Sequence, residues 1–376
     1  MSRNPEKDIP RLLLEWYRTN KRALPWRKTK DPYRIWVAEI MLQQTRVDTV
    51  IPYYERFLNQ FPTVDALARA RLDTVLKAWE GLGYYTRARH LHEAAGIVAR
   101  QLGGKVPDDL DGLRALPGVG AYTGGAILSI AFGKRTAAVD GNVIRVIARL
   151  FAIEDPVDGS RTKKRIGEIA ARLVPVSGPG HYNQALMDLG SGVCTPRNPD
   201  CPSCPLSAAC KARKQGIQES IPEKKRPAAL PRREAVAALV RNDRGEILLV
   251  KRPDRGLLGG LWRFPGGILQ EGEAPAAGLR RVLREELGLK GTAGKELFSV
   301  EHGYSHFSVT VRVLPVAIRG PVPHAGRSVQ WNGVGTRGFS RLAVSRLERK
   351  ILAALRSLRP AGKPIEDGKA TPKRVK

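Results

Sequence analysis

Apolar residues recur at helical spacing through the first 215 residues. The segments Ile9–Asn20, 35–57, 64–79 and 87–102 each carry apolar side chains along one face. Glycine turns such as Gly81-Leu-Gly83 separate these segments. An alternating strand pattern and an internal repeat are both missing from this part of the sequence. The pattern predicts a mainly helical domain over residues 8–215.

The pattern changes after a basic, proline-containing stretch at 216–233, which has the composition of a linker. Ala235–Val240 and Glu246–Arg252 are typical of strands, and the turn at 242–245 predicts that they form a hairpin. A helix is expected at 274–287, with further strands at 297–301 and 307–318. We therefore expect an α+β domain over 234–357, followed by a disordered basic tail at 358–376.

Charge indicates the kind of partner. The 376 residues carry a formal net charge of +28, which favours a polyanion, with nucleic acid ahead of an anionic membrane surface. No segment approaches the roughly 20 apolar residues of a membrane span. The N-terminus lacks the apolar region of a secretory signal. We expect a cytoplasmic, nucleoid-associated protein that does not bind a membrane.

All four cysteines fall within seventeen residues, spaced Cys194-x6-Cys201-x2-Cys204-x5-Cys210. Such clustering indicates metal binding rather than a disulfide framework. Structural zinc is more often held by paired Cys-x2-Cys knuckles. The uneven spacing fits an iron–sulfur cluster better.

A glycine turn and two acids form the candidate site. Gly118-Val119-Gly120 precedes a small-residue helix, so its amides could hold a phosphate. Glu39 lies in an apolar run, and burial would keep it protonated as a general acid. The alternative is an exposed Glu at a helix edge. Asp140 could cap the following helix and still face the site.

These motifs together resemble the helix–hairpin–helix DNA glycosylases of the endonuclease III superfamily, and most closely the MutY family of adenine glycosylases. The resemblance is carried by Glu39-Ile-Met-Leu-Gln-Gln-Thr, Gly81-Leu-Gly-Tyr-Tyr, Leu116-Pro-Gly-Val-Gly, Val139-Asp-Gly-Asn-Val and the cysteine spacing. It implies a monomeric enzyme with a [4Fe–4S] cluster that flips adenine out of double-stranded DNA and cuts its N-glycosidic bond.

The resemblance also implies the role of each residue. Glu39 would protonate adenine, and Asp140 would stabilise the cationic sugar. Tyr122 and Asn142 would support the intermediate and the acids. Endonuclease III-like relatives carry a nicking Lys where this chain has Tyr122, so strand cutting is not expected. The adenine pocket would contain Trp26, Arg27 and Gln184, while Gln44 and Tyr84 would enter the base stack. Core packing is the alternative for Trp26 and Tyr84.

Residues 267–289 resemble the signature of Nudix pyrophosphohydrolases, with Val282 where the pattern needs a metal-binding Glu. The resemblance therefore implies a domain that recognises 8-oxoguanine opposite adenine through Tyr304, Ser305 and His306, where the family has Phe-Ser-His. The alternative for His306 is a histidine without a ligand.

Three functions compete at this point. The first is an adenine glycosylase acting on adenine paired with 8-oxoguanine or guanine. The second is a nucleotide pyrophosphatase that uses the Nudix-like domain, against which Val282 counts. The third is a non-catalytic nucleic-acid binder, against which the separate acids Glu39 and Asp140 count.

Overall fold

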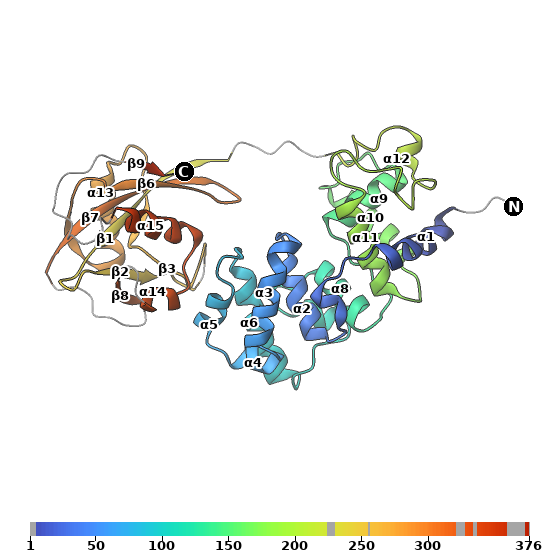
Figure 1. Ribbon diagram of the computed structural model, residues 1–376, viewed down its shortest axis with the longest axis horizontal. Coiled ribbons are helices and arrows are strands. Elements are labelled where there is room, and N and C mark those ends of the chain that lie inside the picture. The colour runs from blue at the N-terminus through green and yellow to red at the C-terminus, as the bar shows by residue number, and fades with distance from the viewer. Residues whose placement is uncertain are drawn as a thin grey trace. The chain divides into compact units, whose positions relative to one another are not determined.

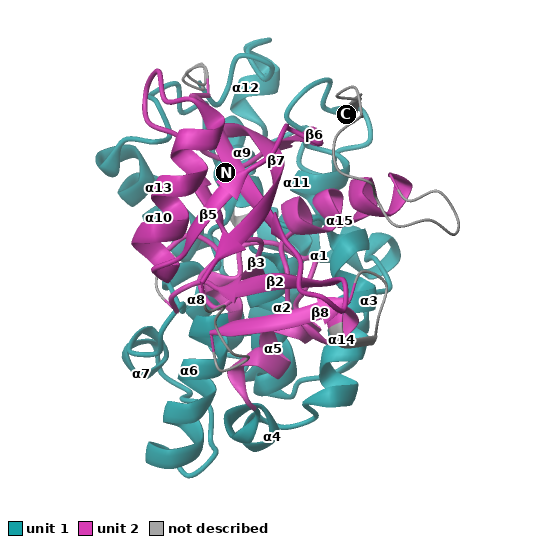
Figure 2. Ribbon diagram, turned by 90° about the vertical axis from the view of Figure 1, so that its left-hand side faces the viewer, with its two compact units in different colours: residues 1–70, 89–227 teal, residues 71–88, 228–376 magenta. Residues whose placement is uncertain are grey.

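The chain folds into two compact units. In the computed structural model, one unit comprises residues 1–70 and 89–227, and the other comprises residues 71–88 and 228–376 (Figure 2). The structure describes residues 5–223, 230–254, 256–320, 328–333, 337–358 and 373–375. The segment 71–88, which the sequence suggests is part of the helical domain, is thus counted with the second unit.

The first unit is helical, as predicted (Figure 1). The predicted segment 35–57 is divided in two at residues 43–46, where Gln44 has a left-handed φ of 56°. Its helices are α1 (Pro5–Asn20), a 3-10 turn (Pro25–Lys28), α2 (Pro32–Leu42), α3 (Val47–Gln60), α4 (Val64–Arg69), α6 (Thr86–Gln101, shared with the second unit), α7 (Leu110–Arg114), α8 (Ala121–Ala131), α9 (Gly141–Phe151), α10 (Ser160–Leu173), α11 (Pro179–Gly192) and α12 (Lys211–Lys214).

One core of this unit is formed by α1, α9, α10 and α11, which bury side chains such as Leu13, Ile147 and Leu186 against one another. Ile221 belongs to this core although it falls within the predicted linker, and its carbonyl accepts a 2.8 Å hydrogen bond from Arg149. The first residues after the cysteine loop are therefore packed on the helices. Residues 224–229 of the linker lie outside the described residues.

The second unit is built on two sheets. In the larger sheet the strand order is β4-β1-β7-β6-β9, with β5 also paired to β7, and the smaller sheet is β3-β2-β8. The strands are β1 (Arg232–Val240), β2 (Glu246–Lys251), β3 (Trp262–Arg263), β4 (Gly266–Ile268), β5 (Lys290–Ala293), β6 (Phe298–Gly303), β7 (Ser308–Arg319), β8 (Val329–Gly333) and β9 (Lys373–Val375). The helices of this unit are α5 (Leu72–Ala78), α13 (Pro275–Leu287), α14 (Arg337–Arg341) and α15 (Arg346–Ser357).

Strand β1 has apolar side chains on both faces. Ala235, Ala237 and Leu239 contribute to one core, which also contains residues of α15. Val236, Ala238 and Val240 contribute to another, which contains residues of α13. Because side chains alternate along a strand, a run that is apolar throughout indicates a sheet covered on both sides.

The predicted hairpin between β1 and β2 is wrong. β1 pairs in parallel with β7 and antiparallel with β4, whereas β2 pairs with β3 and β8. Across the turn, an isolated bridge joins Arg241 to Ile247, and the Asn242 amide donates a 3.0 Å bond to the Glu246 carbonyl. The turn at 242–245 forms as predicted. Each strand, however, makes its ladder of hydrogen bonds with segments distant in sequence, and the local sequence does not encode those partners.

The predicted tail, 358–376, lies mostly outside the described residues. Within it, Lys373–Val375 form β9 beside β6 instead of being disordered. Among the described residues, no helix is long and apolar enough to cross a membrane.

Candidate active site

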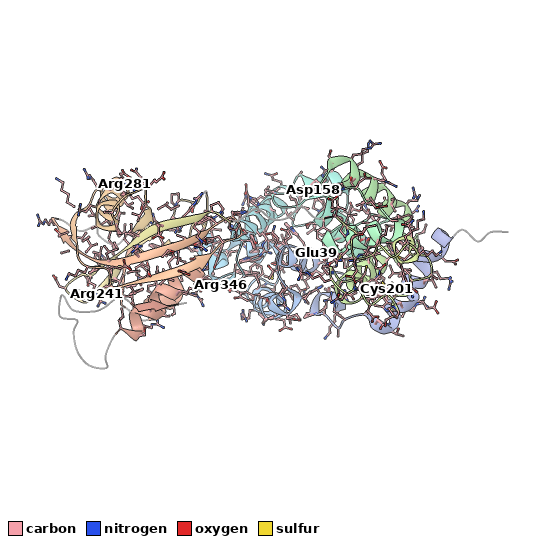
Figure 3. The ribbon with its side chains drawn as sticks, turned by 90° about the horizontal axis from the view of Figure 1, so that it is seen from above. Glu39, Asp158, Cys201, Arg241, Arg281 and Arg346 are labelled. Atoms are coloured by element: carbon pink, nitrogen blue, oxygen red, sulfur yellow. The ribbon has the colours of Figure 1, made fainter. Side chains whose placement is uncertain are left out.

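Glu39 is buried in the middle of α2. The side chains of residues 35–41 are all buried, so the apolar run predicted the environment of Glu39 correctly, and its exposed fraction is 3%. Burial raises the pKa of Glu39 to about 7, with a smaller upward effect from nearby Asp140 and smaller opposing effects from Tyr122 and Arg27. Glu39 therefore keeps a proton at a pH where an exposed Glu is ionised. It lies inside the first unit among the helices (Figure 3).

Tyr122 stands at the start of α8 and bonds directly to Glu39. Its hydroxyl donates a 2.7 Å hydrogen bond to Glu39 Oε2 and lies 3.8 Å from the sulfur of Met187. Burial and the two carboxylates, Glu39 and Asp140, raise the pKa of Tyr122 well above its usual value, so the phenol remains a donor. Because Glu39 is only 3% exposed, the alternative of an exposed Glu at a helix edge is excluded.

The glycine turn joins α7 to α8 as a helix–hairpin–helix. Gly118 has a left-handed φ of 79°, and a Cβ there would lie 2.9 Å from Cβ of His90, so a side chain is excluded twice over. Gly120 caps α8 with open space around it, while Val119 is buried. The N-terminal amides of α8 are therefore approachable by an anion.

Asp140 is the N-cap of α9 and thus has the local role considered from sequence. One carboxylate oxygen accepts a 2.8 Å bond from the Val143 amide and the other accepts a 2.9 Å bond from the Asn142 side chain. Asn142 in turn accepts a 2.8 Å bond from Arg145, whose Nε donates to the carbonyl of Cys194 at 2.8 Å. Capping orients Asp140 without removing it from the site, because its charge acts on both Glu39 and Tyr122.

Arg27 is fixed by Asp188, an acid that no sequence motif singles out. Buried Asp188 on α11 accepts bonds of 2.7 and 3.0 Å from Arg27, and Arg22 pairs with the same carboxylate at 2.6 Å. The guanidinium of Arg27 also lies 5.5 Å from the ring centre of Tyr17. Asp188 could have been found in the sequence by the criterion that identified Glu39, because it too is an acid within an apolar helix.

The other predicted base-pocket residues lie nearby. Gln184 on α11 accepts a 2.9 Å bond from the Tyr17 hydroxyl. With Arg27 and Tyr17 it lines a pocket of about 490 Å³. Trp26 is buried and packs edge-to-face against Tyr54, with ring centres 5.4 Å apart, so core packing accounts for part of its role.

The four cysteines surround one cavity between the loop after α11 and α9. None of them forms a disulfide, and all are partly exposed. Arg149 on α9, 2% exposed, donates to Cys194 Sγ and to the carbonyls of Thr195 and Pro196. The loop is therefore anchored to the helix that begins at Asp140. Figure 3 marks the loop at Cys201.

Known proteins share this architecture and sequence. Residues 37–175 match the HhH-GPD superfamily of base excision DNA repair proteins, and residues 236–354 match the NUDIX domain family. The chain is 36% identical to the adenine DNA glycosylase of Homo sapiens, over 93% of this chain and 74% of that protein. It is 37% identical to that of Buchnera aphidicola subsp. Baizongia pistaciae, over 69% and 73%.

A structure of a thermostable thymine-DNA glycosylase aligns with a TM-score of 0.51 and 33% identity, covering 56% of this chain and 97% of that one. The chain belongs to the adenine DNA glycosylase family. It is a DNA N-glycosylase of base excision repair, and the matched residues 37–175 include Glu39 and the turn at 118–120.

In this adenine glycosylase, arginines hold the acids of the Nudix-like signature. Arg281 pairs with Glu273 at 2.7 Å and with Glu285 at 3.2 Å, and Arg263 pairs with Glu286 at 2.5 Å. Val282, in the place of the missing Glu, is buried. Among the described residues, no three His, Cys, Asp or Glu side chains are placed to hold one metal ion. The arrangement does not favour the pyrophosphatase alternative, because Glu273, Glu285 and Glu286 are already engaged by two arginines, Arg281 and Arg263.

The predicted recognition residues occupy the loop between β6 and β7. Tyr304 is half-buried, with ring centres of His302 and Phe307 at 4.7 and 4.8 Å. Burial raises the pKa of Tyr304 to about 12, which keeps the hydroxyl protonated. Ser305 and His306 are exposed. The loop thus offers two exposed polar side chains beside an anchored aromatic ring.

The two residues expected in the base stack share an unusual backbone. Gln44 and Tyr84 have φ of 56° and 49°, in the left-handed region that non-glycine residues rarely adopt. Both are exposed, Tyr84 by 43%, which excludes core packing as the role of its ring. Both side chains are thus exposed and carried on a backbone conformation that costs energy.

Proposed function

We propose that this enzyme removes adenine paired with 8-oxoguanine, or with guanine, and leaves an abasic site without cutting the strand. The observation that carries the proposal is the buried Glu39, which has a pKa of about 7, accepts a 2.7 Å hydrogen bond from Tyr122 and lies within the field of Asp140. A protonated acid beside a carboxylate is the arrangement that hydrolysis of a glycosidic bond requires.

In the proposed reaction Glu39 gives its proton to a ring nitrogen of the flipped adenine. The N-glycosidic bond then breaks, and its electron pair leaves with the base. The carboxylate of Asp140, oriented by the Val143 amide and by Asn142, stabilises the sugar cation that forms. Water adds to the sugar, and the Glu39 carboxylate takes up its proton, which restores the starting state.

Trp26, Arg27 and Gln184 are proposed to hold the adenine. The buried pair of Arg27 with Asp188 supports this, because an arginine fixed at two oxygens presents a defined edge to the base. Gln184 is also held in place, by a single 2.9 Å hydrogen bond from the Tyr17 hydroxyl. The site is thus organised before the base arrives.

The absence of strand cutting is proposed from Tyr122. A lyase needs an amine that attacks the sugar and forms a Schiff base. The group next to Glu39 is a phenol whose pKa is raised well above its ordinary value, so it supplies neither an amine nor a ready nucleophile.

Recognition of the opposite base is assigned to Tyr304, Ser305 and His306. The exposed Ser305 and His306 carry hydrogen-bonding groups, and the packed ring of Tyr304 fixes their loop. The amides of Gly118, Val119 and Gly120 are assigned to a DNA phosphate, and Gln44 and Tyr84 to the base stack.

The four cysteines fit a [4Fe–4S] cluster better than one zinc ion. All four line a single cavity, and their uneven spacing of six, two and five residues differs from the paired Cys-x2-Cys knuckles of structural zinc. When bound, the cluster would tie the loop 194–210 together and hold its cations toward DNA phosphates. The monomeric state and the cytoplasmic location stay predictions.

A glycosylase assay tests the proposal. The protein is incubated with a duplex that carries adenine opposite 8-oxoguanine, with and without alkali afterwards. We expect strand cleavage at the adenine only after alkali, no borohydride-trapped adduct, and loss of turnover with retained binding in Glu39→Gln and Asp140→Asn. Intact DNA after alkali would refute the removal of the base. Strand nicking without alkali would refute the proposal that the enzyme leaves the strand uncut.

A further inference from the structure

The turn that carries Tyr84 is strained and needs support. Gly81, Gly83 and Tyr84 have φ of 96°, 80° and 49°, so three of four consecutive residues are left-handed. Such a conformation persists only where surrounding contacts determine it. The guanidinium of Arg87 lies 5.4 Å from the ring centre of Tyr84 and donates a 3.2 Å bond to the Gly83 carbonyl, which also accepts a 3.1 Å bond from the Trp79 indole. These bonds hold the Gly83 end of the turn and leave the Gly81 end to other contacts.

Glu80, the residue before this turn, is 7% exposed and is the centre of a charged cluster. Its Oε1 accepts a 2.9 Å bond from the Val344 amide. Its Oε2 lies 2.5 Å from both Lys77 and Arg349, and Lys77 also donates to the Leu342 carbonyl at 2.9 Å. A buried carboxylate with two cations and an amide is costly to disturb, because the remaining charges would lose their partner.

The backbone of the turn is held by the same segment, residues 342–349. Arg346 donates a 2.9 Å bond to the Gly81 carbonyl. The Tyr85 hydroxyl accepts a 3.1 Å bond from the Gly81 amide and donates to the Val344 carbonyl at 3.3 Å. Both polar groups of Gly81 are thus fixed, one directly and one through Tyr85.

The opposite side of this segment faces the Tyr304 loop. Ser345 caps α15 by accepting a 3.1 Å bond from the Leu347 amide, and it is also hydrogen-bonded to the side chain of Tyr304. Lys350, one turn further along α15, donates a 2.9 Å bond to the Glu301 carbonyl on β6, three residues before Tyr304. One helix start therefore touches both the recognition loop and the Tyr84 turn. In Figure 3 this region, marked by Arg346, lies away from Arg281 of the Nudix-like signature.

We propose that the start of α15, residues 344–349, couples recognition of the damaged base to the placement of Tyr84, with Glu80 as the positioning residue. This inference rests on the proposed function, because it assumes that Tyr304 reads 8-oxoguanine and that Tyr84 stacks in the same duplex. Glu80 touches no substrate. It helps to hold the turn in the conformation in which the Tyr84 ring is 43% exposed, where a base can meet it.

The test is a double-mutant cycle between Glu80→Gln and Tyr84→Ala. Single-turnover excision rates are measured opposite 8-oxoguanine and opposite guanine, and 2-aminopurine next to the 8-oxoguanine reports stacking. Each single variant should lower the 8-oxoguanine preference about tenfold and change the 2-aminopurine signal. Glu80→Gln removes the buried charge that accepts the hydrogen bonds, and Tyr84→Ala removes the ring that the turn positions. The double variant should be no worse than Tyr84→Ala.

Asp73→Asn is the matched control. Asp73 on α5 pairs with Lys251 on β2 at 2.6 Å, so the variant breaks an ion pair of the same unit that does not include Glu80. This variant should keep the preference and the 2-aminopurine signal. Arg346→Ala, which removes the bond to the Gly81 carbonyl, replaces Glu80→Gln if the latter does not fold, with a loss of preference expected in the same direction.

Losses that multiply in the double variant, or an equal loss in Asp73→Asn, would overturn the coupling. A failure of the proposed function looks different. In that case the wild-type protein would itself excise no adenine opposite 8-oxoguanine, or would show no preference for it, before any variant is compared.

Discussion

The hydroxyl of Tyr122 donates a 2.7 Å hydrogen bond to Oε2 of Glu39, and both residues belong to the helical unit. Burial raises the pKa of Glu39 to about 7, and this bond opposes the rise because it stabilises the carboxylate. The pair therefore sets the pH range over which the acid holds its proton. Several consequences can be measured separately.

The excision rate should fall as the pH rises above about 7. Glu39 must be protonated to act, and its proton is lost through the pKa of about 7. Single-turnover rates on a duplex with adenine opposite 8-oxoguanine should decrease about tenfold per pH unit on the alkaline side. A rate that stays level between pH 7 and 9 would show that Glu39 is not the acid.

Tyr122→Phe should move this alkaline limb to higher pH. The variant removes the hydrogen bond that lowers the pKa of Glu39, so the acid keeps its proton further up the scale. A charge-assisted hydrogen bond corresponds to a shift of about one pH unit. The quantity to measure is the pH at which the excision rate begins to fall, independently of any change in the maximal rate. A limb displaced to lower pH would contradict this assignment.

Glu39→Gln should stabilise the protein at alkaline pH. The folded pKa of Glu39 lies above its unfolded value, so its favourable contribution is present below about pH 4.5 and is lost as the pH rises through about 7. The gain in unfolding free energy should be about 2 to 3 kcal/mol larger at pH 8 than at pH 5. Urea unfolding at both pH values measures it. Glu168→Gln, an exposed position on α10, should show no such difference.

Asp188→Asn should weaken both folding and binding of the base. Two arginines, Arg22 and Arg27, would lose their shared buried carboxylate, which costs about 3 kcal/mol for a broken buried pair. Thermal unfolding gives the first effect and the excision rate gives the second. Asp155→Asn, which removes an exposed pair with Arg165, is the control and should change unfolding by less than about 1 kcal/mol. Equal losses of stability and of excision rate in both variants would show that Asp188 has no special role in the site.

Cys204→Ser should abolish the broad visible absorption expected of an iron–sulfur cluster. Cys204 lines the cavity together with Cys194, Cys201 and Cys210, and one hard oxygen in place of a thiolate weakens the iron ligand set. The spectrum and the iron content of the purified protein are the measurements. Zinc without iron in the wild-type protein would instead identify a zinc site.

Local sequence predicted several features of the site because they depend on neighbours along the chain. Glu39 is buried because a continuous apolar run surrounds it, and Asp140 caps α9 because an Asp before a helix finds free amides. The cysteine spacing predicted that four thiols gather, and the structure places them around one cavity. The glycines at 118 and 120 indicated the turn between α7 and α8.

Other features could not be read from neighbours. Asp188 lies 161 residues from Arg27 along the chain, and nothing near either residue identifies the partner. The hairpin predicted for β1 and β2 fails for the same reason, since β1 pairs with β7 more than 60 residues later in the numbering. Arg145 and Arg149 look like ordinary helix cations, yet both bind the cysteine loop.

The sequence by itself determined the family, the helical and α+β parts, the buried acid, the capping acid and the clustered thiols. The family follows from the resemblance carried by several motifs between Glu39 and Cys210. The other features follow from apolar periodicity, from residue type or from spacing between near neighbours. Only the tertiary structure decided which charges meet. It joined Tyr122 to Glu39, Arg27 to Asp188, and the Tyr84 turn through Glu80 to the start of α15. Side chains distant in sequence are brought together by packing of the whole chain, so the pKa of Glu39 and the support of Tyr84 are properties of the fold.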